Sequence, residues 1–528
     1  MAEWFKAAVL KTARPSGPRR FESYSLRHPL VPIAVVLAAL LFYACSLAPG
    51  TLWGDPGKLQ RAAWLLDLQL LETSHPVWVA LMHPIVHLPG AEPAWLGNAG
   101  SALLSSLALW PAFRIMRRLG ATSTASVTAC LALAVSHTYW LHAVVTEVYA
   151  LNSLVALLLL DRLTASVLEG RPPSRGGWLL LGLAAGVFSA NHLLVACWIP
   201  GFAWLAARGA DAGRRRQAHL AAAGGLLAGL LPMAAARLAA GLPSSAMLLA
   251  DHMARSLRLE GALADVSLAA ACLIYQFPIP LVIGAALAGL TRLPSRVRGP
   301  ILLLYGASVL LPLRYDVKDR FAFFLPSYLL IAVVAAPGLD RILAWIQSRL
   351  AGAAGPAASC LALLAVAAPP VVYDGVARRL PGLALSRVDA IRQLPGRDKA
   401  RYHLYPGKRG ETSAGLFAQA ALAAVGPGAV LLADFTVWAP LSYLHDVERR
   451  RPDVRLVHAD AAWHLDLALR AAAEGREVFV AAVDVHPEGS PLRARFELVP
   501  IGPIHKAVLR PAGSGDTFPA GPIPAPPG

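Results

Sequence analysis

The stretch LVPIAVVLAALLFYACSLAP, residues 30–49, contains no charged side chain, and WGDPGKLQ follows it at residues 53–60. About 20 consecutive apolar residues are enough for one helix to cross a bilayer. The first charges after this run are Asp55 and Lys58, at the point where such a helix leaves the membrane. They either mark the end of the span or place an acid at the membrane surface for chemistry.

Comparable apolar runs recur along the chain and predict a polytopic helical membrane protein. Residues are 56% hydrophobic and only 15% charged, against roughly a quarter charged in soluble domains. The fold class we predict is an α-helical polytopic membrane protein with about 11 transmembrane helices and a small C-terminal α/β extramembrane domain. We expect spans near 30–49, 97–113, 123–141, 148–168, 177–190, 191–207, 218–240, 266–290, 299–313, 321–339 and 355–373.

Basic residues fall in alternate loops, which sets the expected orientation. They are Arg114, Arg117, Arg118, Arg171, Arg175, Arg208, Arg214, Arg215, Arg216, Arg292, Arg296, Arg298, Arg341 and Arg349. Because Lys and Arg mark the cytoplasmic side, residues 1–29 form a cytoplasmic N-terminal segment, and an odd number of spans puts the C-terminus outside. The net charge of +16 is then explained by topology and contact with membrane lipids, and no nucleic-acid motif is present.

The other set of loops carries acids and histidines. The longest, residues 50–96, combines a helical apolar period over 58–72 with a short, proline-divided apolar stretch typical of an interfacial helix. Residues 30–373 thus form the transmembrane domain, with 50–96 as its first outer loop, which would be the catalytic loop if its acid, Asp55, serves chemistry. Residues 374–510 contain buried-strand patterns at 428–435 and 477–485 and a helical pattern at 458–475, and the Pro/Gly-rich tail 511–528 is predicted to be disordered.

Four polar groups on the predicted outer side are candidates for chemistry. Asp55 is either a solvated helix end or a general base. Glu147 lies in the aromatic stretch SHTYWLHAVVTEVYALN (136–152), where a charge between apolar spans is costly. His192, beside Asn191, either forms hydrogen bonds that hold neighbouring helices together or is part of a functional site. The turn at 314–320 is either a polar hairpin or a phosphate site, with Asp316, Lys318, Asp319 and Arg320.

Taken in order, these segments resemble the GT-C superfamily of membrane glycosyltransferases, and more narrowly its uncharacterised-domain branch related to a transmembrane protein O-mannosyltransferase. The most specific match is Glu147-Val148-Tyr149-Ala150-Leu151. Looser matches are Asp55-Pro56-Gly57-Lys58, His75-Pro76-Val77-Trp78, Thr138-Tyr139-Trp140, Asn191-His192, residues 316–326 and WAPLSYLHDVERRRPDV (438–454). Two departures stand out: Lys58 replaces the family's Glu, and Val77-Trp78-Val79 replaces a Pro-Gly-Tyr turn.

The resemblance implies a polyprenyl-phosphate-linked sugar donor and an inverting transfer to an acceptor hydroxyl at the outer face. Asp55 would be the general base, and Glu147 and His75 would position the sugar or acceptor. His192, Asp316, Lys318, Asp319 and Arg320 would complete the binding site, with Lys318 or Arg320 facing the departing phosphate. Whether a divalent cation binds at the first-loop acid stays open, because family members differ. The acceptor would be a protein or a glycan.

Other function classes remain open from the sequence. A polytopic transporter or lipid flippase also carries charges at membrane mouths, and Lys58 is compatible with a non-catalytic membrane scaffold. The Ala/Arg/Pro-rich composition is typical of a bacterial protein, which would place the chain in the inner membrane.

Overall fold

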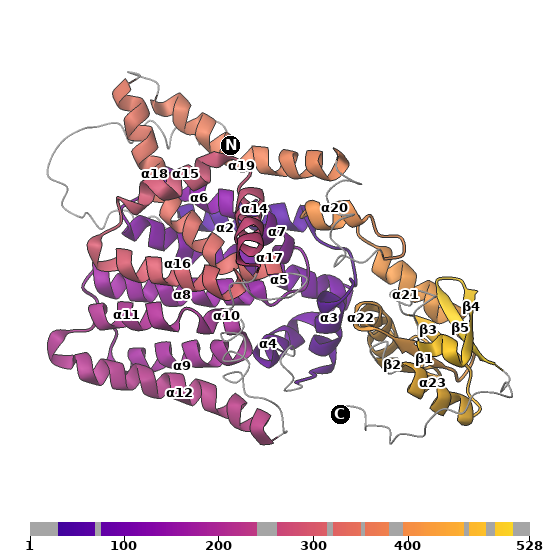
Figure 1. The fold of residues 1–528 in the computed structure, drawn as a ribbon. Helices are drawn as coiled ribbons and strands as arrows, with labels where there is room; N and C mark the ends of the chain where they lie inside the picture. The colour runs from indigo at the N-terminus through magenta and orange to yellow at the C-terminus, as the bar shows by residue number, and fades with distance from the viewer. Residues whose placement is uncertain are drawn as a thin grey trace. The chain divides into compact units, whose positions relative to one another are not determined.

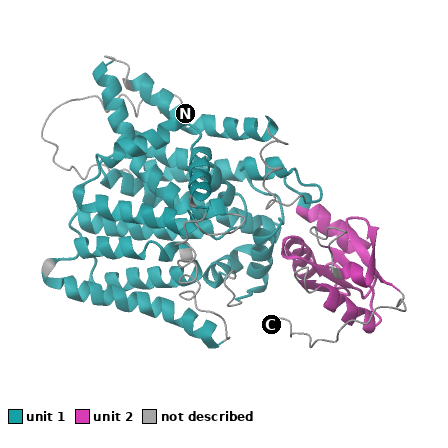
Figure 2. Cartoon of the chain, in the orientation of Figure 1, with its two compact units in different colours: residues 1–413 teal, residues 414–528 magenta. Residues whose placement is uncertain are grey.

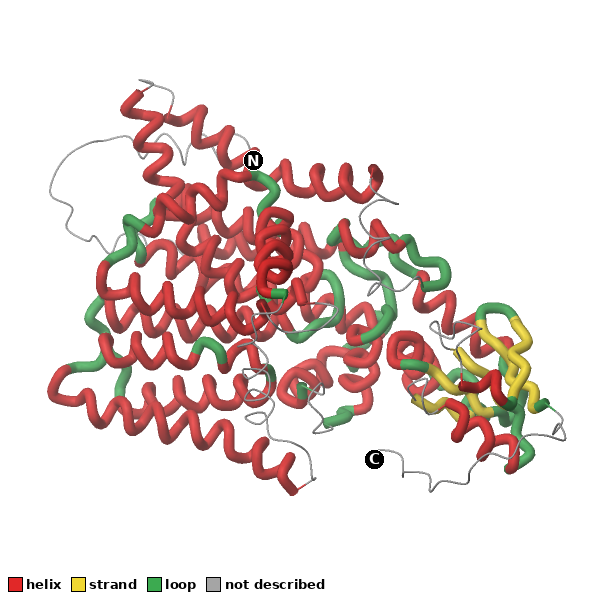
Figure 3. Tube along the Cα trace, in the orientation of Figure 1, coloured by secondary structure: helices red, strands yellow, loops and turns green. Residues whose placement is uncertain are grey.

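The computed structural model describes residues 30–68, 75–239, 261–313, 320–349, 354–379, 394–458, 464–481 and 491–510 (Figure 1). The chain divides into two compact units, residues 1–413 and 414–528 (Figure 2). Figure 3 shows that strands occur only in the second unit, and the described part of the first is helices and loops. The functional domain boundaries predicted at residues 373 and 510 stay predictions.

The helices of the first unit follow the expected apolar runs. In chain order they are α2 (Leu30–Ser46), α3 (Asp55–Leu65), α4 (Pro76–Val86), α5 (Pro93–Arg118), α6 (Ser123–Ala134), α7 (His137–Ala143), α8 (Tyr149–Leu168), α9 (Arg175–Asn191), α10 (Leu193–Ala196), α11 (Ile199–Gly209), η2 (Ala212–Arg214), α12 (Arg215–Ala239), α14 (Ala262–Gln276), α15 (Pro280–Leu290), α16 (Ser295–Leu313), α17 (Arg320–Phe323), α18 (Leu325–Arg349), α19 (Ala354–Arg379) and α20 (Lys399–Leu404).

The expected count of about 11 spans is not confirmed. Six of the described helices are long and apolar enough to cross a membrane, or seven if the bent pair α14 and α15 forms one span. The difference arises because several apolar runs are not single helices: the run at 123–141 divides into α6 and α7, and α14 meets α15 at 106°. Pro278 and Pro280 lie at that bend, and proline cannot continue the hydrogen bonding of a helix.

A network of oppositely charged side chains joins α5 and α8. Asp161 of α8 accepts from Arg118 of α5 and lies 3.3 Å from Arg114 Nε. Arg118 Nε also donates to Glu169 Oε1 at 2.6 Å. Because charges among apolar helices are costly unless they pair, this network fixes the ends of α5 and α8 together.

Glycines allow the closest helix crossings. The helix pairs α9–α12 and α15–α18 pack along their lengths, and a Cβ atom added at Gly338 of α18 would collide with the carbonyl oxygen of Ala285 in α15. Such small-residue contacts let membrane helices approach closely enough for backbone packing.

The second unit is a small α/β fold. Its five-stranded sheet has the order β2-β1-β3-β5-β4, with β1 parallel to β2 and β3, and β5 antiparallel to β3 and β4. The elements are α21 (Ser413–Ala424), β1 (Val430–Ala433), α22 (Phe435–Ser442), η3 (Tyr443–Val447), β2 (Arg455–His458), α23 (His464–Ala473), β3 (Val478–Ala481), η5 (Pro491–Ala494), β4 (Phe496–Ile501) and β5 (Ile504–Leu509). The expected C-terminal α/β arrangement is confirmed within the described residues.

The α15–α18 crossing gives the first prediction. Gly338→Ala should lower the free energy of unfolding by about 1–3 kcal/mol, because the added methyl group overpacks the crossing. Gly284→Ala, on α15 with open space around its Cβ position, should be neutral or stabilise by up to about 1 kcal/mol through helix propensity. Thermal unfolding of the purified protein in detergent compares the two. Equal shifts would show that the close crossing is not what limits stability.

Candidate functional site

The first-loop acid begins a helix. Asp55 is the first residue of α3, and Gly54 precedes it with φ = 68°, a conformation that glycine adopts without strain. Lys58 follows one turn later, at the i+3 spacing that brings helical side chains onto one face. The loop after the first apolar helix therefore presents an acid and a base together.

Lys58 is the common neighbour of the predicted site residues. Burial lowers the pKa of its ammonium, while the charges of Asp55, Asp67 and Glu147 raise it. Burial raises the pKa of the Asp55 carboxyl, and the Lys58 charge opposes this shift. The Lys58 charge also lowers the pKa of His75. We call Asp55, Lys58, His75 and Glu147 the Lys58 cluster, since each of the other three residues interacts electrostatically with Lys58.

A buried polar network fixes α3 relative to the Glu147 loop. Asn98 of α5 is fully buried, and its Oδ1 accepts from Gln60 Nε2 at 3.1 Å and from Thr146 N at 2.8 Å. The Asn98 Nδ2 group donates to the carbonyl oxygens of Ala48 at 3.0 Å and Gly50 at 3.1 Å. The Asn98 side chain thus joins three segments: the residues that follow α2, the α3 helix and the loop before α8.

The next residue, Glu147, is held through its backbone. Its N–H donates to Ser101 Oγ at 3.1 Å, one helical turn along α5 from Asn98. A Cβ atom at Gly97 would lie 2.8 Å from Thr146 Oγ1, so the loop needs a glycine there to reach α5. Backbone contacts therefore fix the loop, and the charge of the Glu147 carboxylate raises the pKa of Lys58.

His75 lies in a conformation that is uncommon for a residue with a side chain. Its φ is 48°, in the left-handed region that costs energy for most residues. His75 Nδ1 donates to the carbonyl oxygen of Asn191 at 2.8 Å. Burial is the main reason that the pKa of His75 falls to about 4. The ring is therefore neutral at physiological pH.

Asn191 acts as a cap for a helix other than its own. Its Oδ1 accepts from Val77 N at 3.0 Å and Trp78 N at 3.3 Å, which satisfies the first turn of α4. The adjacent His192 stacks on His75, with ring centroids 5.2 Å apart and planes 15° from parallel. Of the Asn191-His192 pair, Asn191 therefore holds helices together and His192 extends the Lys58 cluster.

Aromatic side chains continue from His192. Tyr149, the first residue of α8, lies edge-on to both His192 and His142, at centroid distances of 5.5 and 4.6 Å. Phe323 of α17 lies 6.0 Å from His192. The TEVYALN stretch therefore contributes its acid to the Lys58 cluster and its tyrosine to the adjoining histidines.

The predicted phosphate-binding turn is only partly described. Asp316, Lys318 and Asp319 lie outside the described residues. Arg320 begins α17, and its Nη1 is 2.5 Å from Asp265 Oδ1 in α14. Its guanidinium therefore already has a carboxylate partner, while Phe321 and Phe323 of the same short helix lie against the histidines.

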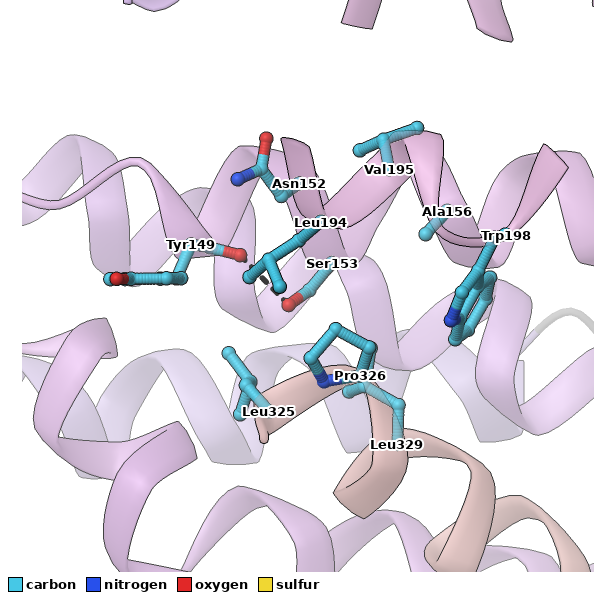
Figure 4. Close-up of a pocket in the computed structure, with 10 residues that line it drawn as sticks. All are labelled: Tyr149, Asn152, Ser153, Ala156, Leu194, Val195, Trp198, Leu325, Pro326 and Leu329. Carbon is cyan, nitrogen blue, oxygen red and sulfur yellow. Dashed lines mark hydrogen bonds between the residues drawn. The ribbon is translucent and has the colours of Figure 1, made fainter. Parts of the chain in front are cut away.

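A small cavity adjoins Tyr149 (Figure 4). Its volume of about 10 Å³ is close to that of one water, and its lining includes Asn152 and Ser153 of α8 and Pro326 of α18. Ser153 Oγ donates to the Tyr149 carbonyl oxygen at 2.8 Å. The side-chain amide of Asn152 is buried and makes no hydrogen bond within the described chain. It is therefore an unsatisfied polar group in a mostly apolar cavity lining.

Sequence reasoning missed the segment 394–413, which returns to the helical unit. Lys408 is 2% exposed, its backbone N–H donates to Ser46 O at 2.8 Å, and its Nζ donates to the carbonyl oxygens of Tyr402 and Tyr405. Burial lowers the pKa of Lys408 to about 7.

The same segment reaches the Lys58 cluster through Tyr402. Burial is the main cause that raises the Tyr402 pKa to about 12, and the Glu147 charge adds to it. The guanidinium of Arg397, a mostly buried side chain, lies 4.5 Å from the Tyr402 ring centroid. The basic, aromatic composition of RDKARYHLYPGKRGE (397–411) is the signal that could have placed this segment at the site.

The described residues do not fit a divalent metal site. In that part of the chain, no three His, Cys, Asp or Glu side chains are arranged to hold a metal ion. The charges of Asp55 and Glu147 instead both raise the pKa of Lys58. We therefore derive no step through a metal.

Comparison with known proteins confirms the resemblance that the sequence indicated. Residues 71–212 match the family model described as the protein O-mannosyl-transferase TMEM260 N-terminal domain. This match contains His75, Glu147 and His192 but begins after Asp55 and Lys58. No curated protein matches the chain.

Solved structures show the fold. ArnT from Cupriavidus metallidurans bound to undecaprenyl phosphate is 14% identical, with a TM-score of 0.55 over 91% of this chain and 97% of that one. Its apo structure gives 15% identity and a TM-score of 0.50 over 92% and 98%. The oligosaccharyltransferase AglB from Archaeoglobus fulgidus, in complex with an inhibitory peptide and a dolichol-phosphate, gives 12% and 0.49 over 85% and 69%. The likeness to ArnT shows that the chain has the fold of a GT-C glycosyltransferase.

The Asn98 network gives the second prediction. Asn98→Ala should lower the free energy of unfolding by roughly 3 kcal/mol, because it leaves several buried groups without partners, and should reduce activity by loosening α3. Ser106→Ala is the matched control: Ser106 is equally buried on α5 but bonds only to Ala102 O of its own helix, so about 1 kcal/mol is expected. Chemical unfolding in detergent measures both, and equal losses would contradict a linking role for Asn98.

Proposed function

We propose that this chain is a membrane glycosyltransferase that moves a sugar from a polyprenyl-phosphate donor to an acceptor hydroxyl, with inversion. The observation that carries the proposal is the Lys58 cluster: two acids and a histidine from separate segments of a GT-C fold share one half-buried lysine as their electrostatic neighbour. The match of residues 71–212 to an O-mannosyl-transferase domain supports the same reaction class.

In the proposed step, the Asp55 carboxylate takes the proton of the acceptor hydroxyl. The acceptor oxygen bonds to the anomeric carbon as the bond from that carbon to the phosphate oxygen breaks. The electron pair leaves with the polyprenyl phosphate. Burial supports this role for Asp55, because its raised pKa makes it a better proton acceptor when ionised.

His75, His192 and Glu147 would bind the sugar or acceptor, and Lys318 or Arg320 would face the departing phosphate, with Asp316 and Asp319 beside them. Cations at that position stabilise the charge that develops on the leaving group. The lipid donor is supported by the solved ArnT structure, which holds undecaprenyl phosphate. The chain's exposed apolar helices would let a polyprenyl tail lie in the bilayer.

The proposed setting is a bacterial inner membrane, crossed several times, with the N-terminus cytoplasmic and the C-terminal unit outside. The alternate placement of basic loops supports this orientation. The Lys58 cluster would then face the outer leaflet, where a protein or glycan acceptor is reached.

Lys58 has a further part in the proposal. Because its charge opposes the upward shift of the Asp55 pKa, the lysine keeps the base ionised at lower pH than burial alone would allow. It also supplies positive charge beside both acids, so the proposed step needs no divalent ion at these residues.

The general-base role gives the third prediction. Asp55→Asn should reduce sugar transfer by at least about 100-fold, the usual contribution of a positioned base, while the protein stays folded. Asp67→Asn is the control, since Asp67 also senses Lys58 but pairs with Arg61 at 3.3 Å outside the cluster. The assay follows release of labelled sugar from a polyprenyl-phosphate donor by purified protein. Full activity of the Asp55 variant would remove it from the mechanism, and donor flux without covalent change would indicate a transporter or flippase instead.

The pairing of Asp55 with Lys58 gives the fourth prediction. A base must be ionised, so the rate should rise with pH through the Asp55 pKa. Removing the Lys58 charge in Lys58→Gln lets that pKa rise further, so the acidic limb should move to higher pH. Lys58→Arg keeps the charge and should leave the limb near its original position. A pH–rate profile of the three proteins tests this, and a limb that stays or moves to lower pH in Lys58→Gln would rule out the coupling.

A further inference from the structure

A second polar site lies away from the Lys58 cluster. An open pocket of about 590 Å³ is formed between the end of α11, the start of α12 and the start of α16. Its lining residues are Trp204, Ala207, Arg208, Arg215, Ser295 and Arg296. The three arginines face one pocket without an acid in its lining, and none of them forms an ion pair with a described carboxylate. Like charges held together in this way favour an anionic ligand.

The basic pocket is at the opposite end of the helices from the Lys58 cluster. Gly209, at the end of α11, touches Ser166 near the end of α8, whereas Tyr149 at the start of α8 contacts His192. A 20-residue helix is about 30 Å long. The two sites are therefore separated by most of the length of α8.

The pocket is built around a fixed arginine. Arg208 Nη1 donates to the carbonyl oxygen of Arg296 at 2.7 Å, and Arg296 Nη2 donates back to the Arg208 carbonyl at 3.3 Å. The Arg208 guanidinium lies 5.1 Å from the Trp204 ring centroid, a cation–π distance. Trp204 in turn lies against Gly299, where a Cβ atom would be 2.7 Å from Trp204 Cη2. These contacts hold the Arg208 and Arg296 guanidinium groups in place before any ligand arrives.

Two features identify the class of ligand. Ser295 is the first residue of α16, and helix N-terminal amides favour phosphate. Apolar side chains are exposed directly beyond the pocket on both neighbouring helices, with Leu220 of α12 63% exposed and Leu302 of α16 46% exposed. Half-exposed Trp204 is a residue typical of the membrane interface. The charged pocket therefore continues into surface suited to acyl chains.

We propose that this basic pocket binds the phosphate headgroup of an anionic membrane phospholipid, with the acyl chains lying along α12 and α16. Arg215 and Arg296 contact the phosphate, and Arg208 on Trp204 orients it. The lipid fastens three helix ends together at the end of the helical unit that carries no part of the Lys58 cluster. This site is independent of the proposed transferase chemistry.

The test uses the full chain in nanodiscs of phosphatidylcholine, with and without phosphatidylglycerol. Native mass spectrometry of the released protein measures retained phosphatidylglycerol. The variant Arg215→Gln/Arg296→Gln should retain it with about 30-fold lower affinity, as expected for loss of two basic contacts near a membrane surface. Arg214→Gln is the matched control for the single variant Arg215→Gln, because it removes one positive charge one residue outside the lining, and it should stay within about twofold of the original protein.

Folding and ligand source are tested in the same series. All variants should unfold at the same temperature in phosphatidylcholine alone. Should the double variant fail to fold, Arg215→Gln alone should lower affinity about fivefold. Millimolar inorganic phosphate should not displace the lipid. An equal loss of affinity in Arg214→Gln would show that diffuse surface charge holds the lipid, and displacement by phosphate would show a site for free anions. Unchanged retention in the double variant would show that the pocket does not bind the lipid. Each of these results overturns the proposal.

Discussion

The amide side chain of Asn98 is the interaction on which the candidate site depends. Its two ends connect the chain after α2, the α3 helix and the loop before α8. Those are the segments that carry Asp55, Lys58 and Glu147. The Thr146 N–H and the Ala48 carbonyl lie in the buried interior, where polar groups need hydrogen-bond partners, so separating the segments would be costly. The acids are therefore held near Lys58 by an uncharged residue that takes no part in the proposed chemistry.

The sequence predicted where helices form better than which of them span a membrane. Apolar runs mark α5, α8 and α12 clearly because each is long and continuous. The same signal does not distinguish one span from two bent helices, since the direction of the chain at Pro278 depends on packing with α18 and other neighbours. The strands β1 and β3 were predictable because they are short, apolar and bounded by turns.

The candidate site was predictable in its charged members and not in its supports. Asp55, Glu147 and His192 stand out as polar groups beside apolar runs. Gln60 and Asn98 are uncharged and resemble any polar residue in a helix, so only the tertiary structure shows that they bond to each other. Lys408 was missed because residues 394–413 return to the helical unit from beyond the last apolar run. Such a return depends on contacts distant in sequence, which local pattern does not encode.

The stacked imidazoles of His75 and His192 have one more consequence. A carbonyl oxygen only accepts, so the contact with Asn191 requires a proton on Nδ1 of His75. Leu194 N–H donates to Nδ1 of His192, so that nitrogen is bare and the proton of this ring is on Nε2. The two neutral rings are thus opposite tautomers, one with an accepting Nε2 and the other with a donating Nε2. A sugar hydroxyl, which can donate and accept at once, is the kind of group that such a pair complements.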